Sequence, residues 1–285
     1  KKKYGWPLMV MATTGKNSKA RVIEITSILG GMLAINMSMQ SMDKKVLENI
    51  KRSNIKLDHM ADINSHIRSE GRSTKGELIM ALPGETKETF IKGLNNMLNA
   101  NGTLICIYTL IMLHGTEFKN PEYREKFKYK TKFRIVPLNF GEYEGQKLFD
   151  YEEVAIATKD LSFDDYLLLR GIALLVESLH NGRPFNEFFD YAKLFGIQPA
   201  TLLKQLYDNV STASKNIQKI MDDFINETRS ELWDSEEKLL EHYNKDENYL
   251  RLKNGEVGGN LIYKYKSKNL IDVGSEWNDY FEQQV

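Results

Sequence analysis

Short apolar runs alternate with stretches of helical periodicity in the first part of the chain, and this alternation restricts the fold more than any other feature. The apolar runs cover 7–14, 33–37, 78–82 and 104–108, and the helical stretches cover 18–29, 43–50, 57–70 and 86–98. Strands separated by helices of this length pair in parallel, because a parallel pair needs a long crossover connection. The runs are largely apolar and do not alternate with polar residues, which is typical of strands buried on both faces of a sheet. The first part of the chain is therefore predicted to be α/β.

The predicted fold class is a partial (β/α) barrel of the TIM type, built from parallel strands and followed by a mostly helical domain. Four βα units are too few to close an eight-stranded barrel. The first apolar run begins at Pro7, with no capping element before it. We therefore expect the chain to begin inside a domain, with earlier strands of the barrel preceding Lys1.

The second half of the chain changes character near Phe133. Helices are predicted over 163–180, where Ser162 and Asp165 form a capping pair, and over 184–195 and 199–210. A long amphipathic helix follows over 211–243, with a break near 233–234, and alternation around Asn254-Gly255 predicts a hairpin. We therefore divide the chain into a partial barrel at 1–135 and a helical domain at 136–285 with a small β-hairpin near 249–265.

Composition excludes several classes of protein. Basic and acidic residues balance at 39 each, which argues against a general nucleic-acid or anionic-membrane binder. The longest apolar stretch, 104–113, is too short to span a bilayer. The single cysteine, Cys106, excludes an internal disulfide framework, so the cytoplasm is the expected compartment.

Two segments at the ends of predicted strands carry the most specific signals. Residues 37–43 read MSMQSMD, with Arg52 twelve positions after Gln40, and residues 77–86 read ELIMALPGET. The first resembles the radical S-adenosylmethionine (SAM) pattern of a strand ending in G-V-Q-S, a helix and a basic residue. The second resembles the D-L-I-x-G-L-P-G-E/Q-T segment of that superfamily, and 104–117 is similar to its next strand and continuation.

The resemblance implies a SAM site at the carboxyl ends of the strands. Gln40 would offer its amide to the ribose or methionine moiety, and the Arg52 guanidinium would pair with the methionine carboxylate. Glu77 would accept hydrogen bonds from the ribose hydroxyls. Pro83 would support the adenine, whose edge would be bound by backbone groups near Tyr108. The predicted SAM-binding residues are Ser38, Gln40, Arg52, Glu77, Pro83 and Tyr108.

The 4Fe-4S cluster that this resemblance implies cannot be held by this chain. The cluster motif C-x3-C-x2-C is absent, and one cysteine cannot replace three thiolates. Its ligands are expected outside this chain, and no metal ligand or catalytic residue is predicted within it. The helical half is similar to the tails of radical SAM proteins with an N-terminal cobalamin-binding domain, so the resemblance also allows cobalamin, bound outside this chain.

The predicted function is the C-terminal part of a radical SAM enzyme. In full-length form it would generate a 5′-deoxyadenosyl radical that acts on an unidentified substrate, whereas this chain alone is expected to be inactive. The alternative is a non-catalytic α/β module that binds a ligand or partner and has lost the cluster site. A third interpretation, an unrelated parallel α/β enzyme, would require a closed barrel within these residues.

Overall fold

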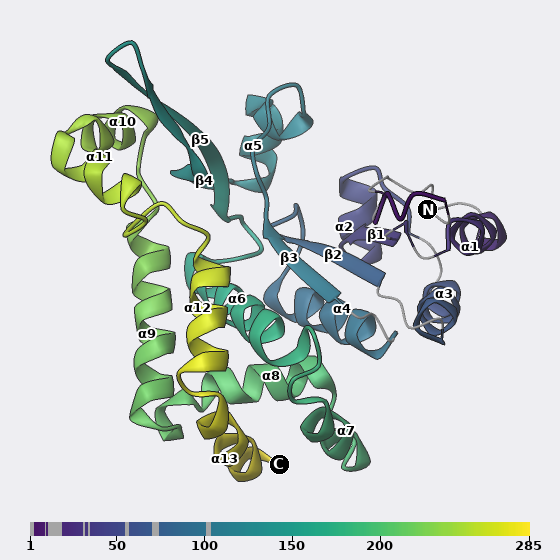
Figure 1. Ribbon diagram of the computed structural model, residues 1–285. Coiled ribbons are helices and arrows are strands. Elements are labelled where there is room, and N and C mark those ends of the chain that lie inside the picture. Colours follow the sequence, from purple (N-terminus) through teal and green to yellow (C-terminus); the bar gives the residue numbers. More distant parts are fainter. Residues whose placement is uncertain are drawn as a thin grey trace.

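The computed structural model describes residues 3–8, 10, 19–30, 32–33, 35–54, 57–69, 74–100 and 104–285. A small parallel sheet with its helices, a long β-hairpin and a bundle of helices follow one another along the chain (Figure 1). The predicted strand at 7–14 lies mostly outside the described residues, although Val10 forms a parallel bridge with Leu33. Among the described residues, no helix is both long enough and apolar enough to cross a membrane.

The first half alternates helices and strands as predicted. Its elements are α1 (Lys19–Ile28), β1 (Ile35–Gln40), α2 (Lys44–Asn49), α3 (Leu57–Ser69), β2 (Thr74–Met80), α4 (Lys87–Asn99) and β3 (Leu104–Thr109). The Asp43 carboxylate caps α2 by accepting from Lys45 and Val46, and Thr86 with Thr89 forms a capping box on α4. Local capping therefore explains where these helices begin.

The three described strands form one parallel sheet in the order β1-β2-β3. Ser38 of β1 pairs with Glu77 of β2, and Glu77 pairs with Cys106 of β3. The predicted parallel α/β arrangement is therefore confirmed. The described strands do not close into a barrel.

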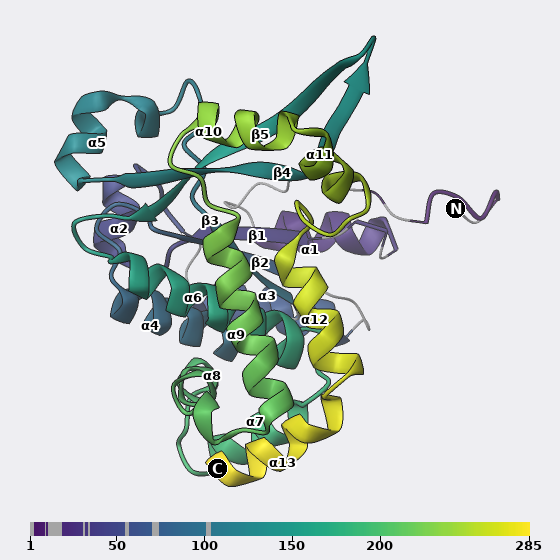
Figure 2. The same ribbon diagram turned by 90° about the vertical axis from the view of Figure 1, so that its left-hand side faces the viewer.

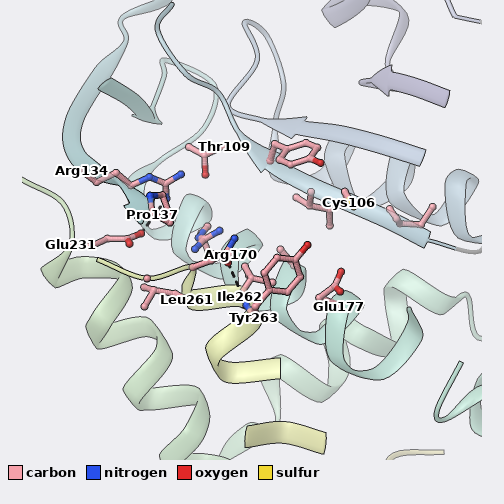
Figure 3. A pocket seen from close by; sticks show the side chains of 16 residues that line it. Cys106, Thr109, Arg134, Pro137, Arg170, Glu177, Glu231, Leu261, Ile262 and Tyr263 are labelled. Atoms are coloured by element: carbon pink, nitrogen blue, oxygen red, sulfur yellow. Dashed lines mark hydrogen bonds and ion pairs between the residues drawn. The ribbon is translucent and has the colours of Figure 1, made fainter. Parts of the chain in front are cut away.

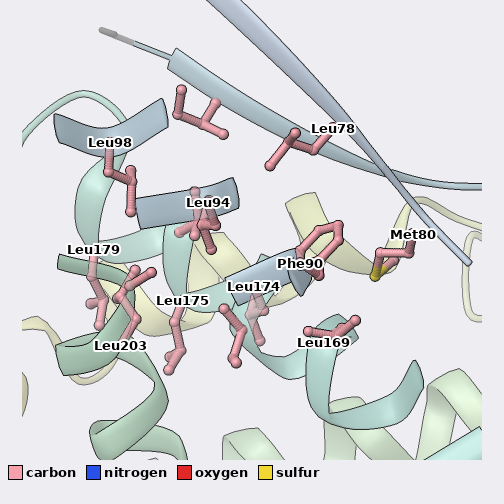
Figure 4. Close-up of a cluster of buried hydrophobic side chains, with 14 of the residues drawn as sticks. Leu78, Met80, Phe90, Leu94, Leu98, Leu169, Leu174, Leu175, Leu179 and Leu203 are labelled. Carbon is pink, nitrogen blue, oxygen red and sulfur yellow. The ribbon is translucent and has the colours of Figure 1, made fainter. Parts of the chain in front are cut away.

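One face of this sheet is buried and the other carries polar groups. Along β2, the residues from Thr74 to Met80 alternate strictly between buried and half-buried. Leu78 and Met80 point toward Phe90 and Leu94 of α4 (Figure 4). Burial of each such side chain contributes about 1.5–3 kcal/mol, so this face anchors the sheet on its helices.

The second half contains a hairpin and a helical bundle. After η1 (Glu117–Lys119) and α5 (Pro121–Phe127) come β4 (Lys130–Tyr143), β5 (Gln146–Ala157), α6 (Phe163–Leu175), the π-helical turn η2 (Val176–His180), α7 (Asn186–Leu194), α8 (Pro199–Asp208), η3 (Val210–Thr212), α9 (Lys215–Ser230), α10 (Glu236–Asn244), α11 (Asp246–Lys253), α12 (Leu261–Ile271) and α13 (Gly274–Gln284). Helices α9 and α12 run side by side in both views (Figures 1 and 2). The predicted break near 233–234 is confirmed, because Trp233 leaves the helix and exchanges backbone hydrogen bonds with Phe133 of β4.

The β-hairpin predicted near 249–265 is wrong. Residues 246–253 and 261–271 are helical, because Tyr249 and Leu252, three apart, lie on one helical face in an apolar cluster with Phe140 and Phe149. The hairpin is instead β4–β5, which turns at Glu144 and Gly145 with φ of 51° and 78°. Positive φ at both positions is typical of the two-residue turn that matches strand twist. The predicted boundary at 135 falls within β4, and the division into 1–135 and 136–285 stays a prediction.

Asn181 binds the free edge of β3 in the way that another strand would. Its Oδ1 accepts from the Ile105 N–H at 2.9 Å, and its Nδ2 donates to the Ile105 carbonyl at 2.9 Å. Both residues are buried, at 4% and 2% exposure. The side chain therefore attaches the helical half to the sheet edge.

Replacing this amide is expected to destabilise the protein. Asn181→Leu leaves a buried N–H and a buried C=O without partners, at roughly 1–3 kcal/mol for each group. We expect the free energy of unfolding in urea to fall by about 2 kcal/mol or more. Asn254→Leu, at an exposed position on the α11 end, is the matched control, with an expected effect within about 0.5 kcal/mol. Equal effects of the two substitutions would contradict the role of Asn181.

Candidate cofactor-binding site

Polar side chains from all three strands meet on the half-buried face of the sheet. Glu77 and Ser38 are direct neighbours across β1 and β2, and the Ser38 hydroxyl donates a hydrogen bond to Glu77 Oε2. Lys75 Nζ lies 2.9 Å from Glu77 Oε1 and 2.8 Å from the Tyr108 hydroxyl. The strands therefore bring Ser38, Glu77 and Tyr108 together, and Lys75 joins them.

The electrostatics of this face keep the Lys75 ammonium charged. Burial alone would lower the pKa of Lys75, but hydrogen bonds with Glu77 and Tyr108 outweigh it and hold the pKa above its usual range. Burial raises the pKa of Tyr108 and of the Cys106 thiol. Glu77 thus faces the sheet surface as an acceptor, and Cys106 remains a thiol at neutral pH.

The backbone turns sharply at the ends of β1 and β2. Gln40 and Ala81, which stand at these two ends, both have φ of 64°, in the left-handed region. The pairing of β1 with β2 is irregular between Ser38 and Gln40. Ala81 occupies a conformation that favours glycine, so the alanine Cβ places strain on the backbone there.

Arg52 lies just after α2, and Pro83 lies in the loop that follows β2. Arg52 is exposed just beyond α2, and its N–H donates to the Leu47 carbonyl at 2.9 Å, which closes the helix end. The Pro83 carbonyl accepts from Asn49 Nδ2 at 2.8 Å. A Cβ at Gly84, where φ is 88°, would lie 2.7 Å from that same Nδ2, so glycine is required for this contact. Pro83 is therefore tied to α2, close in sequence to Arg52.

Gln40 and Arg52 are not joined to the Lys75 group. Within the described part of the chain, neither side chain contributes a hydrogen bond to Ser38, Glu77 or Tyr108. The structure therefore brings three of the six predicted residues together, whereas Gln40 at the end of β1, Arg52 after α2 and Pro83 after β2 are not hydrogen-bonded to them.

Sequence reasoning missed two residues of this region, Lys75 and Glu85. Glu85 is 1% exposed, and its Oε1 accepts from Ser41 at 3.0 Å and from Thr89 at 3.3 Å. Burial raises the pKa of Glu85 to about 7, against these hydrogen bonds. It links the loop after β1 to the loop after β2. The alternation of charged and small residues at 75–77 could have identified Lys75, whereas nothing local distinguishes Glu85 from an exposed helix-start acid.

The side chains present do not fit an iron–sulfur cluster. Among the described residues, no three His, Cys, Asp or Glu side chains come together as a metal site. Cys106 is the only cysteine of the sequence, and its thiolate is disfavoured by burial.

Comparison with known proteins gives two relatives and no matching family profile. Over 184 residues, the chain is 31% identical to the cobalamin-dependent radical SAM methyltransferase TokK of Streptomyces tokunonensis, covering 62% of this chain and 27% of that protein. Over 226 residues, it is 28% identical to a 2-(S-pantetheinyl)-carbapenam-3-carboxylate methyltransferase of Streptantibioticus cattleyicolor, covering 71% of this chain and 33% of that protein. The chain thus spans a third or less of the length of these relatives.

These relatives define a class of protein. Both relatives are methyltransferases, and TokK is of the radical SAM class, which supports the radical SAM resemblance of the motifs at 37–52 and 77–86.

Proposed function

We propose that this chain forms part of a SAM-dependent radical enzyme and that its polar sheet face binds SAM. The observation that carries the proposal is the group of Ser38, Glu77, Lys75 and Tyr108, which spans three parallel strands. Ligands of parallel α/β folds bind near the carboxyl ends of the strands. The similarity to radical SAM methyltransferases supports SAM as the ligand.

Each predicted residue has a role that its position allows. The Glu77 carboxylate would accept from the two ribose hydroxyls, held in place by Ser38 and Lys75. Gln40 and the exposed Arg52 would bind the methionine moiety, with Arg52 on its carboxylate. Pro83 and Tyr108 would flank the adenine. These groups bind and orient SAM and exclude water from it.

The chemistry itself would come from groups that this chain does not hold. SAM supplies a methyl group or, after one-electron reduction, a 5′-deoxyadenosyl radical. The cluster that delivers the electron, and cobalamin, would be bound by other parts of the whole protein. We propose methyl transfer as the reaction class, on a substrate that stays unidentified.

Substitution of Glu77 tests the SAM site directly. Glu77→Gln removes the charge that accepts from the ribose, and a hydrogen bond to a charged group contributes about 1.5–3 kcal/mol. We expect the dissociation constant for SAM, measured by isothermal titration calorimetry on the chain, to rise roughly 10- to 100-fold.

The control is Glu142→Gln, which changes an exposed carboxylate of β4. Its affinity for SAM should equal that of the wild type. If the wild-type chain does not bind SAM, the non-catalytic module becomes the better account. If Glu77→Gln binds SAM as tightly as the wild type, Glu77 is not in the site.

A further inference from the structure

A pocket lies between the edge of β3 and the helical half. Helix α6, the start of α12 and the β4 strand enclose it with β3 (Figure 3). Its volume is about 140 Å³. A cavity of about this volume is large enough for a molecule such as benzene. The pocket can therefore hold a small organic molecule or one end of a larger one.

The buried guanidinium of Arg170 distinguishes this pocket. Arg170 lines it from α6 and is only 6% exposed. Its Nε has no hydrogen-bond partner, and within the described chain no carboxylate forms an ion pair with it. The guanidinium lies over the Phe224 ring, whose centroid is 5.5 Å from Cζ. A buried charge without hydrogen bonds is costly, and an oxyanion would satisfy it.

The other charged groups of the pocket are paired within the protein. Arg134 lies 2.7 Å from Glu152 and 3.1 Å from Glu231. Glu177 is paired with Lys266 at 2.7 Å. Arg170 is thus the pocket's unpartnered cation in the part of the chain that the structure describes.

Backbone donors face the same space. Leu261 and Ile262 begin α12 and line the pocket, and the first N–H groups of a helix have no partner within it. The N-cap side chain of Asn260 satisfies only the Tyr263 N–H. Strand β3 forms the opposite side of the pocket, which Ile107 lines. Two residues earlier in the same strand, the backbone N–H and C=O of Ile105 are hydrogen-bonded to Asn181. Helix N-termini favour anions, so this arrangement adds to the Arg170 charge.

We propose that this pocket is a binding site for the carboxylate of a small organic acid. The carboxylate would sit between the Arg170 guanidinium fork and the N-terminus of α12. The apolar part of the ligand would pack against the side chains of Ile107 from β3 and Ile262 from α12. This site is separate from the residues proposed to hold SAM on the sheet face, apart from Tyr108, which borders both.

A pair of isosteric probes tests the site without SAM. The full chain is titrated with 4-fluorobenzoate and with neutral 4-fluorobenzamide, and binding is followed by fluorine NMR. We expect the benzoate signal to shift and broaden with protein concentration and the benzamide signal to stay unchanged. Arg170→Gln should weaken benzoate binding at least tenfold, whereas Arg251→Gln, an exposed arginine of α11 outside the pocket, should not.

A measurement on the wild type keeps the test decisive if Arg170→Gln does not fold. The arginine Nε–Hε resonances of the labelled wild-type chain are recorded with each probe. Benzoate should shift one protected Nε–Hε signal, and benzamide should shift none. Equal effects of benzoate and benzamide, no benzoate binding, or full affinity in a folded Arg170→Gln variant would each overturn the carboxylate site. Failure of SAM to bind would leave this result untouched.

Discussion

Glu153→Gln is expected to lower the free energy of unfolding by about 3–5 kcal/mol. Glu153 of β5 is 8% exposed and accepts from Arg124 at 2.6 Å, from Lys119 and from Thr131 at 2.5 Å. Removing its charge leaves two cations around a buried site without their counter-ion, and breaking a buried pair on one side costs this amount. Urea unfolding followed by circular dichroism at pH 7 measures the loss.

The pH dependence of Glu153 gives the same prediction a second readout. Burial alone would raise the pKa of Glu153, but the Arg124, Lys119 and Thr131 hydrogen bonds lower it to about 2. A carboxyl with a depressed pKa stabilises the fold above its unfolded value near 4.5 and loses that contribution as pH falls toward 2. Over this window the wild type should therefore lose about 3 kcal/mol more stability than Glu153→Gln, which lacks this titrating group.

An exposed ion pair provides the control for Glu153. Glu256→Gln removes the partner of Arg251 at 3.4 Å, where both side chains are half exposed. Exposed pairs contribute about 0–1 kcal/mol, so this variant should unfold nearly as the wild type does. If Glu153→Gln lowered the free energy of unfolding no more than Glu256→Gln does, the buried cluster would stabilise the fold no more than an exposed ion pair.

Glu85→Gln is expected to remove a loss of stability at high pH. Burial raises the pKa of Glu85 to about 7, so folding disfavours its charged form. A carboxyl with a raised pKa carries no penalty below pH 4.5, where it is protonated in both states. The penalty grows as pH rises to 7 and is complete above it, at about 3 kcal/mol. Glu85→Gln should therefore gain about 3 kcal/mol relative to wild type between pH 4.5 and pH 8.

Urea unfolding at several pH values, compared with Glu88→Gln, measures this effect. Glu88 lies three residues further on, in the first turn of α4, and is exposed. Its variant should keep the pH dependence of the wild type. A Glu85→Gln variant with the same slope as wild type would show that Glu85 is charged in the folded protein at no cost.

The secondary structure of the first half follows from local features of the chain. The apolar runs at 33–37 and 104–108 and the caps at Thr86 and Ser162 predict elements that the structure contains. The hairpin near 249–265 was predicted wrongly, because its alternating residues also fit one helical face. Glu144-Gly145, the actual turn, offers only one glycine as a local signal. An alternating sequence pattern alone does not distinguish a hairpin from a helix here. Packing against β4 and β5 decides between them.

The candidate sites depend on contacts that no short segment encodes. The motifs predicted the importance of Ser38, Glu77 and Tyr108, and the strand register then placed them on one face with Lys75. Arg170 reads in sequence as one charge in an apolar helix. Its burial in a pocket results from α12, about 90 residues later, and from β3, about 60 residues earlier.

The sequence by itself determined the alternation of strands and helices in the first half, the parallel arrangement and the likeness to radical SAM proteins. These depend on periodicity, caps and short motifs, which act over a few residues. The tertiary structure alone decided which polar groups are buried, which are paired and which face a pocket. That outcome depends on desolvation and on partners distant along the chain, as for Glu85, Glu153 and Arg170.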